Sequence, residues 1–149
     1  MTGKRVLPPT YLVLSIVIMV ALHFLFPVVG IIPSPWNRLG AIPFALGLVI
    51  NLTADRALKN HNTTVKPFQA STALVTNGVF KVTRNPMYLG FVLILVGIAI
   101  FMGSLTPFAV IPAFAVLINT VFIKVEETML EDTFGQHWLE YKKMVRRWI

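Results

Sequence analysis

The feature that most constrains this chain is an uncharged stretch of 39 residues, which runs from Asn85 to Ile123. As one continuous helix it would measure about 58 Å, close to twice the roughly 30 Å hydrocarbon core of a lipid bilayer. Its middle reads Gly-Ser-Leu-Thr-Pro at positions 103–107, a combination typical of turns. The stretch therefore predicts a helical hairpin, with membrane spans near 86–102 and 107–123.

Two shorter uncharged runs precede this hairpin. The first lies between Arg5 and Arg38 and predicts a span near 11–32, which at about 1.5 Å per residue is long enough to cross a hydrocarbon core. The second predicts a shorter span near 39–54. The sequence as a whole therefore predicts an all-α membrane protein, with about four transmembrane helices in one membrane domain that comprises residues 1–149.

Composition agrees with a membrane protein and excludes several other classes. Of the 149 residues, 56% are hydrophobic and 13% are charged, whereas a soluble domain has roughly 25% charged residues. So few charges cannot cover a water-facing surface, which excludes an ordinary soluble enzyme, a disordered tail and a DNA-binding module. We therefore expect the lipid bilayer, and no nucleic acid, as a partner.

Lysine and arginine residues are distributed unevenly between the predicted loops. If both termini are cytoplasmic, 12 of the 13 lie on the cytoplasmic side, in agreement with the positive-inside rule. This orientation predicts a cytoplasmic loop at 55–85 and a cytoplasmic tail at 124–149. Because the chain is compact and carries no retention signal, we expect it in a prokaryotic inner membrane.

The tail carries an apolar stripe whose members recur at three- and four-residue steps, as on one face of a helix. Basic residues flank the stripe, and its aromatic members suit the headgroup level of a membrane. We therefore predict an amphipathic interfacial helix that covers whatever the loop 55–85 builds. The stripe consists of Leu130, Phe134, Trp138, Tyr141, Val145 and Trp148.

The usual patterns of catalytic and metal-binding residues are absent from the sequence. The three histidines, His23, His61 and His137, fall in a span, a loop and the tail, so no metal site is predicted. None of the six acidic residues lies inside a predicted span, which argues against a proton-coupled transporter. A small four-helix transporter or assembly protein without catalytic activity stays open as an alternative.

Two polar motifs remain, and the predicted hairpin brings them to the same side of the membrane. Asn85-Pro86 suits the start of a helix, where free N–H groups and the positive dipole end favour a polar ligand. Glu126-Glu127 follows the last span. A helix cap and a solvated acid pair explain the two motifs equally well. Together they would also suit a zwitterionic ligand with an added positive centre.

The polar loop and the tail resemble the isoprenylcysteine carboxyl methyltransferase family, in the same order, over roughly residues 60–149. Phospholipid N-methyltransferases share the broader pattern. In the loop and the following helix start, the resemblance rests on Leu74-Val75-Thr76, Gly78, Arg84-Asn85-Pro86-Met87-Tyr88 and Gly90. In the tail it rests on Glu126-Glu127, Phe134-Gly135 and Leu139-Glu140-Tyr141-Lys142-Lys143.

This resemblance implies an integral membrane methyltransferase that uses S-adenosylmethionine at the cytoplasmic face. A lipid-like or small apolar acceptor would enter from the bilayer, while the cofactor arrives from the cytosol. The resemblance leaves the catalytic residues unassigned, with Arg84 and Glu127 as candidates. Carried over by position, the cofactor-binding residues would be Thr72, Ala73, Leu74, Val75, Phe80, Asn85, Pro86, Met87, Tyr88 and Glu126.

Two positions depart from the family pattern. Asn85 stands where the family commonly has histidine. An asparagine can still cap a helix and form hydrogen bonds, but it has no titratable group. Phe122 stands where the family enzyme has an arginine that faces the substrate, which argues against a prenylcysteine acceptor because no cation would meet its carboxylate. A sterol-reductase-like enzyme that binds NADPH is a further alternative, and cofactor competition would separate it from a methyltransferase.

Overall fold

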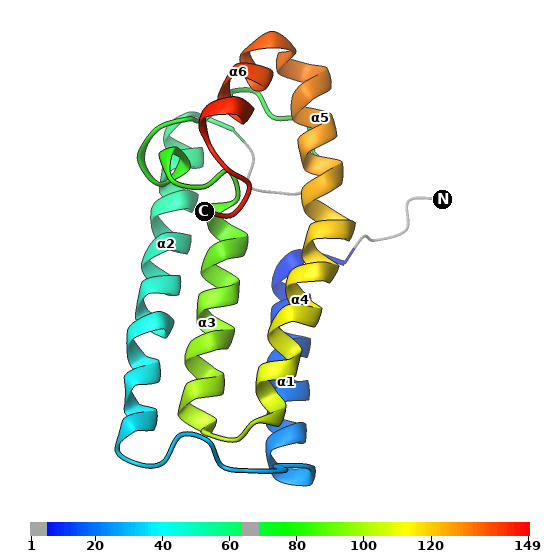
Figure 1. The fold of residues 1–149 in the computed structure, drawn as a ribbon. Coiled ribbons are helices and arrows are strands. Elements are labelled where there is room, and N and C mark those ends of the chain that lie inside the picture. The colour runs from blue at the N-terminus through cyan, green and yellow to red at the C-terminus, as the bar shows by residue number, and fades with distance from the viewer. Residues whose placement is uncertain (1–5, 64–68) are drawn as a thin grey trace.

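The computed structural model describes residues 6–63 and 69–149, and the regular elements within these ranges are helices (Figure 1). Residues 1–5 of the predicted domain and 64–68 of the predicted loop lie outside the described residues. The α-helices are α1 (Pro8–Leu25), α2 (Ala41–Asn60), α3 (Pro86–Met102), α4 (Val110–Ile118), α5 (Lys124–Phe134) and α6 (Gln136–Met144). Short 3-10 turns are η1 (Trp36–Gly40), η2 (Gly78–Lys81) and η3 (Thr106–Ala109), and η4 (Asn119–Ile123) is a π-helical turn.

The predicted all-α membrane fold is confirmed. Three helical runs are long and apolar enough to cross a membrane, and the shorter apolar helix α3 lies among them. The three runs are Pro8–Leu25, Trp36–Asn60 and Thr106–Phe134.

The helix ends differ from the sequence-based expectation for identifiable reasons. The first helix ends at Leu25 and not near Ile32, because Pro27 disfavours helical geometry at the residue before it. The last run does not end near 123, and continues through η4 and α5 until Gly135, whose φ of +50° interrupts it. Helix α5 therefore extends beyond the N-terminal end of α3 (Figure 1).

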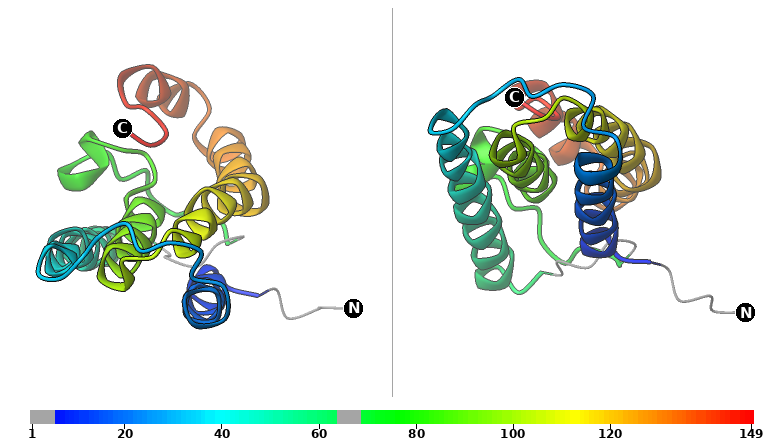
Figure 2. Two further views of the ribbon diagram at one scale, coloured as in Figure 1. Left: turned by 60° about the horizontal axis from the view of Figure 1, so that its bottom comes forward. Right: turned by 90° about the horizontal axis from the view of Figure 1, so that it is seen from below.

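Helices α2 and α3 pack closely because small residues face each other along their contact. A Cβ atom added at Gly40 would collide with the carbonyl oxygen of Gly97, and one added at Gly47 would collide with that of Gly90. On its other side α3 packs against α4 and α1, around a buried core that includes Leu95. Seen from below in Figure 2, α2, α3 and α4 follow one another, and α1 lies beside α4.

After α5, the chain turns back toward the N-terminal end of α3. Gly135 separates α5 from α6, and the segment Val145–Ile149 then descends toward the start of α3 (Figure 1). The backbone N–H of Arg84 donates to the carbonyl of Arg146 at 3.0 Å. This return brings the tail against the loop 69–85, in agreement with the predicted covering helix.

Candidate functional site

A cavity of about 310 Å³ lies where the loop 69–85, the first turns of α3 and the helices α5 and α6 meet. Its walls are mostly apolar, and a few polar side chains converge on it, as in many small-molecule sites. Nine of the ten residues predicted to bind the cofactor line this one cavity. They are Ala73, Leu74, Val75, Phe80, Asn85, Pro86, Met87, Tyr88 and Glu126.

Thr72, the tenth residue, does not line the cavity. Its backbone N–H donates to Thr63 Oγ1 at 3.1 Å, and its hydroxyl donates to the carbonyl of Asn62 at 2.8 Å. Thr72 therefore ties the loop to the end of α2.

Tyr88 and Glu126 join the two sides of the predicted hairpin within the cavity. The Tyr88 hydroxyl in the first turn of α3 donates to Glu126 Oε1 in the first turn of α5, at 2.6 Å. A hydroxyl that donates to a carboxylate at this distance forms a strong hydrogen bond. The residues are 38 positions apart, so only the return of the chain brings them together.

Asn85 occupies the N-cap position of α3, but its side chain does not cap the helix. Its Nδ2 donates to the carbonyl of Arg147 at 3.0 Å, and the Thr83 hydroxyl donates to the same carbonyl at 3.0 Å. The capping role expected from the sequence is therefore wrong. The side chain instead fastens the descending segment 145–149 to the start of α3, because the two lie in contact there.

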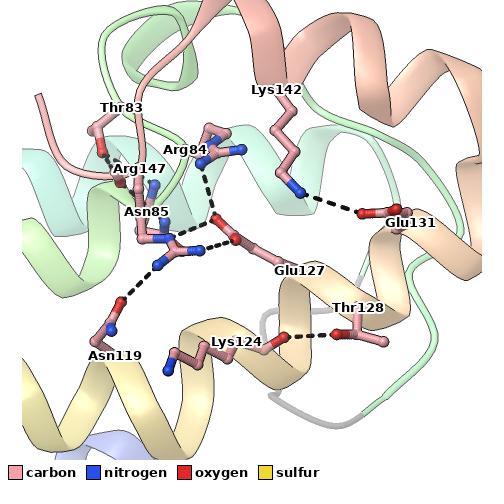
Figure 3. A network of polar contacts seen from close by, with 10 residues as sticks. All are labelled: Thr83, Arg84, Asn85, Asn119, Lys124, Glu127, Thr128, Glu131, Lys142 and Arg147. Carbon is pink, nitrogen blue, oxygen red and sulfur yellow. Dashed lines mark hydrogen bonds and ion pairs between the residues drawn. The ribbon is translucent and has the colours of Figure 1, made fainter.

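Glu127 lies at the centre of a buried ion network, shown in Figure 3. Only 6% of Glu127 is exposed. Arg147 donates to both of its carboxylate oxygens, from Nε at 3.1 Å and from Nη2 at 2.6 Å, and Arg84 Nη2 lies 3.2 Å from Oε1. Arg147 Nη1 also donates to Asn119 Oδ1 at 3.2 Å, and its bonds to Glu127 raise the pKa of the Arg147 guanidinium.

Arg84 joins this network to the cavity wall. Its side chain is only 7% exposed, and its guanidinium lies 5.5 Å from the centre of the Trp138 ring, within cation–π range. Among the residues that the structure describes, Arg84 Nε, Arg84 Nη1 and Trp138 Nε1 have no hydrogen-bond partner. Arg84 and Trp138, which both line the cavity, therefore keep buried donors that no described residue pairs.

Helix α6 contributes two cavity residues that the sequence analysis did not assign to the site. Trp138 and Tyr141 are almost fully buried, and the Tyr141 hydroxyl donates to the carbonyl of Phe80 at 2.6 Å. Burial raises the pKa of Tyr141 to about 12. Both residues belong to the apolar stripe of the tail, which packs inward against Leu74 of the loop. The stripe was the available signal, but its period does not tell a lipid-facing surface from a protein-facing one.

Comparison with known proteins identifies the family. The model of the phospholipid methyltransferase family matches residues 36–137, more than two thirds of the chain. The chain belongs to this family. The expected membrane methyltransferase family is thereby confirmed, with an integral membrane location.

One of the proteins similar to this chain is an isoprenylcysteine methyltransferase. Protein-S-isoprenylcysteine O-methyltransferase A of Arabidopsis thaliana is 32% identical over 129 residues, which cover 81% of this chain and 62% of that protein. An uncharacterized protein of Haemophilus influenzae is 38% identical over 63 residues, which are 42% of this chain and 100% of that protein.

A solved structure shares the fold. The eukaryotic intramembrane Ras methyltransferase ICMT (isoprenylcysteine carboxyl methyltransferase) superposes with a TM-score of 0.67 at 27% identity. The superposition covers 95% of this chain and 51% of that one. The chain thus spans about half to two thirds of the length of the methyltransferases that it matches.

Proposed function

We propose that this protein is an S-adenosylmethionine-dependent methyltransferase, and that the cofactor occupies the cavity between the loop 69–85, α3, α5 and α6. One observation carries the proposal. Residues that resemble a family's cofactor-binding motifs come from segments up to about fifty positions apart, yet nine of the ten line a single cavity. A helix start and an isolated acid pair would have no reason to converge in this way.

The chemistry of the lining fits this cofactor. A volume of about 310 Å³ lies at the lower end of the range for small-molecule sites. The apolar and aromatic walls, with Phe80 among them, suit the adenosyl part. The carboxylate of Glu126 suits an ammonium group or ribose hydroxyls, and the unpaired N–H groups of Arg84 suit a carboxylate.

When bound, S-adenosylmethionine supplies a methyl group that is already activated on a sulfonium centre. The protein then has to bind the cofactor and the acceptor, orient them toward each other and exclude water from the site. Trp138 and Tyr141 cover the cavity from α6, and Tyr88 fixes the carboxylate of Glu126. We assign no proton-accepting role to Glu127, because both of its oxygens already accept hydrogen bonds from guanidinium groups.

The acceptor that we propose is a lipid-like or small apolar molecule. The cavity is bordered by Leu7, Pro8 and Pro9 at the start of α1, and so extends to the first residues of a membrane-spanning helix. Phe122 is buried, with its ring 5.5 Å from that of Tyr11 and 6.3 Å from that of Tyr88. An aromatic cluster at this point supplies no cation for a substrate carboxylate, which argues against prenylcysteine.

The distribution of basic residues supports a cytoplasmic position for this end of the molecule. With the cavity, α6 and both termini in the cytoplasm, the positive-inside rule is satisfied. The proposed setting is the inner membrane of a prokaryote.

Calorimetry on the detergent-purified protein tests the proposal. We expect saturable binding of S-adenosylmethionine and S-adenosylhomocysteine, and none of NADPH. Glu126→Gln should weaken that binding by at least about tenfold, since the loss of a charged hydrogen-bonding group in a binding site costs about 1.5–3 kcal/mol. The matched control is Glu140→Gln, because Glu140 is exposed on α6 and does not line the cavity.

Three results would contradict the proposal. Equal weakening by Glu126→Gln and Glu140→Gln would overturn the position of the cofactor. Binding of NADPH alone would favour a reductase. Binding of none of the three ligands would leave the motifs as a helix start and an acid pair, and would favour a transport or assembly role.

A further inference from the structure

We infer that Arg147 is a positioning residue of the proposed cofactor site, which sets the geometry of the cavity through Glu127 and Arg84 without touching the ligand. The inference rests on the proposed function. Arg147 lies outside the segments that resemble family motifs, and it does not line the cavity. Its contacts nevertheless reach two parts of the chain that form walls of the cavity, the last membrane-spanning helix and the segment that leads into α3.

The first wall is the last membrane-spanning helix. Arg147 Nη1 bonds to Asn119 in the π-helical turn η4, and its Nε and Nη2 bond to Glu127 in α5. One side chain therefore bridges the first residue of the turn where the hydrogen-bond pattern changes and a point on the helix beyond it. Such π-helical turns shift the phase of the residues that follow. The bridge thus holds the phase in which Glu126 faces Tyr88.

The second wall is the segment that leads into α3. The carbonyl of Arg147 accepts hydrogen bonds from the Thr83 hydroxyl and from Asn85 Nδ2, and the carbonyl of Arg146 accepts one from the Arg84 N–H. The backbone of residues 146 and 147 thus holds the segment 83–85 in place, and with it positions the Arg147 side chain beside Glu127. Figure 3 shows Thr83, Asn85 and Arg147 in contact beside Glu127.

Electrostatics makes the arrangement sensitive to Arg147. Glu127 is buried, and without Arg147 its one remaining ion pair with a described residue is the 3.2 Å contact with Arg84. A buried carboxylate that loses its two shortest charge-assisted bonds draws more strongly on its remaining partner. Arg84 would then shift away from its place beside Trp138, and the donors that it offers to the cavity would move with it.

Binding of S-adenosylhomocysteine by purified full-length variants tests this inference. Arg147→Ala should raise the Kd by about tenfold or more, the usual range when a group that orients a ligand-binding side chain is lost. Arg147→Lys should recover part of the affinity, because an ammonium group keeps the charge but forms fewer bonds. Lys143→Ala removes one positive charge from an exposed site on α6 and should stay within about twofold of wild type.

A double-mutant cycle separates positioning from a general loss of stability. If Arg147 acts through Glu127, the variant Glu127→Gln/Arg147→Ala should bind no more than about twofold more weakly than Glu127→Gln alone. All variants are compared at a temperature at which thermal unfolding shows them folded. If Arg147→Ala does not fold, the Arg147→Lys variant carries the same comparison with Glu127→Gln.

The outcomes distinguish this inference from the proposed function. Wild-type affinity in Arg147→Ala, or multiplicative losses in the double mutant, would overturn the role of Arg147 while the cofactor assignment stands. Failure of the wild-type protein and Lys143→Ala to bind adenosyl ligands would overturn the proposed function, and the inference with it.

Discussion

The two ends of the helical bundle are joined in contrasting ways. At the α5–α6 end, charged side chains form a buried network around Glu127 beside a cavity. At the opposite end, no ion pair joins the loops after α1 and α3 among the residues that the structure describes. Gly30 pairs with Ser104 in an isolated antiparallel bridge, and His23 Nδ1 lies 2.7 Å from Ser104 Oγ. The contrast teaches that hydrogen bonds close one end of the bundle, whereas an ion network and a cavity lie at the other.

The largest effect should come from the α2–α3 contact, on which both ends depend. Gly47→Ala places a methyl group against the Gly90 backbone, and overpacking of this kind costs about 2 kcal/mol of unfolding free energy. Thermal unfolding in detergent should show a clearly lowered Tm. Gly30→Ala is the matched control, because nothing lies within 4 Å of the added atom. An equal fall in Tm for both variants would refute the close contact of the two helices.

The next effect should be confined to the α5–α6 end. Tyr88→Phe removes the donor to Glu126 and should weaken S-adenosylhomocysteine binding by about tenfold, the value of one hydrogen bond to a charged group. Tyr11→Phe is the control, because the Tyr11 ring packs against Phe122 without lining the cavity. Calorimetry measures both affinities. A Tyr11→Phe variant that binds as weakly as Tyr88→Phe would show that the loss is not specific to the Tyr88–Glu126 hydrogen bond.

A smaller effect is expected at the opposite end, on stability alone. Ser104→Ala removes the partner of His23 and should lower the unfolding free energy by about 1 kcal/mol. Affinity for S-adenosylhomocysteine should be unchanged, since the contact lies at the other end of the bundle. His23→Ala should have the same effect on Tm, and the double variant should add little. Any loss of ligand affinity in Ser104→Ala would abolish the proposed separation of the two ends.

The smallest effect concerns the pH dependence of α6 docking. The pKa of Tyr141 in the folded state is raised to about 12, from an ordinary value of 10.0, so folding favours the neutral hydroxyl. Its contribution to stability is therefore complete below pH 10 and is lost as the pH rises from 10 toward 12. Tyr141→Phe should lose less stability than wild type over the accessible part of this window, as Tm measured between pH 8 and pH 11 would show. An identical dependence of Tm on pH in the two proteins would mean that folding does not change the pKa of Tyr141.

Local sequence signals predicted the helices better than their ends. The turn at 103–107 is present, because Gly103 adopts a φ of +71° that a glycine permits without strain. The predicted span near 107–123 ends before Lys124, whereas the helix itself continues to Phe134, because the edge of a span and the end of a helix are different boundaries. Charged residues do not interrupt a helix, and no residue before Gly135 does so.

The candidate site was predicted where the signal is local and missed where it depends on how the chain returns. Asn85, Pro86 and Glu126 belong to short motifs, and they were placed in the site from the sequence. Arg147 could not be, because a basic residue in a basic tail has no distinctive pattern. Its partner Asn119 lies 28 positions away, in a π-helical turn that the periodicity of the sequence does not predict.

The sequence by itself determined that the chain lies in a membrane as a set of helices, because long uncharged stretches can satisfy their backbone hydrogen bonds there only as helices. It also determined that the loop and the tail share one side of the bundle, because the hairpin between them has an even number of spans. Only the tertiary structure decided which side chains meet there. Burial of Glu127 requires cations close by, and the fold supplies them from the start of α3 and from the returning segment 145–149. That choice depends on distances across the fold, which no local pattern encodes.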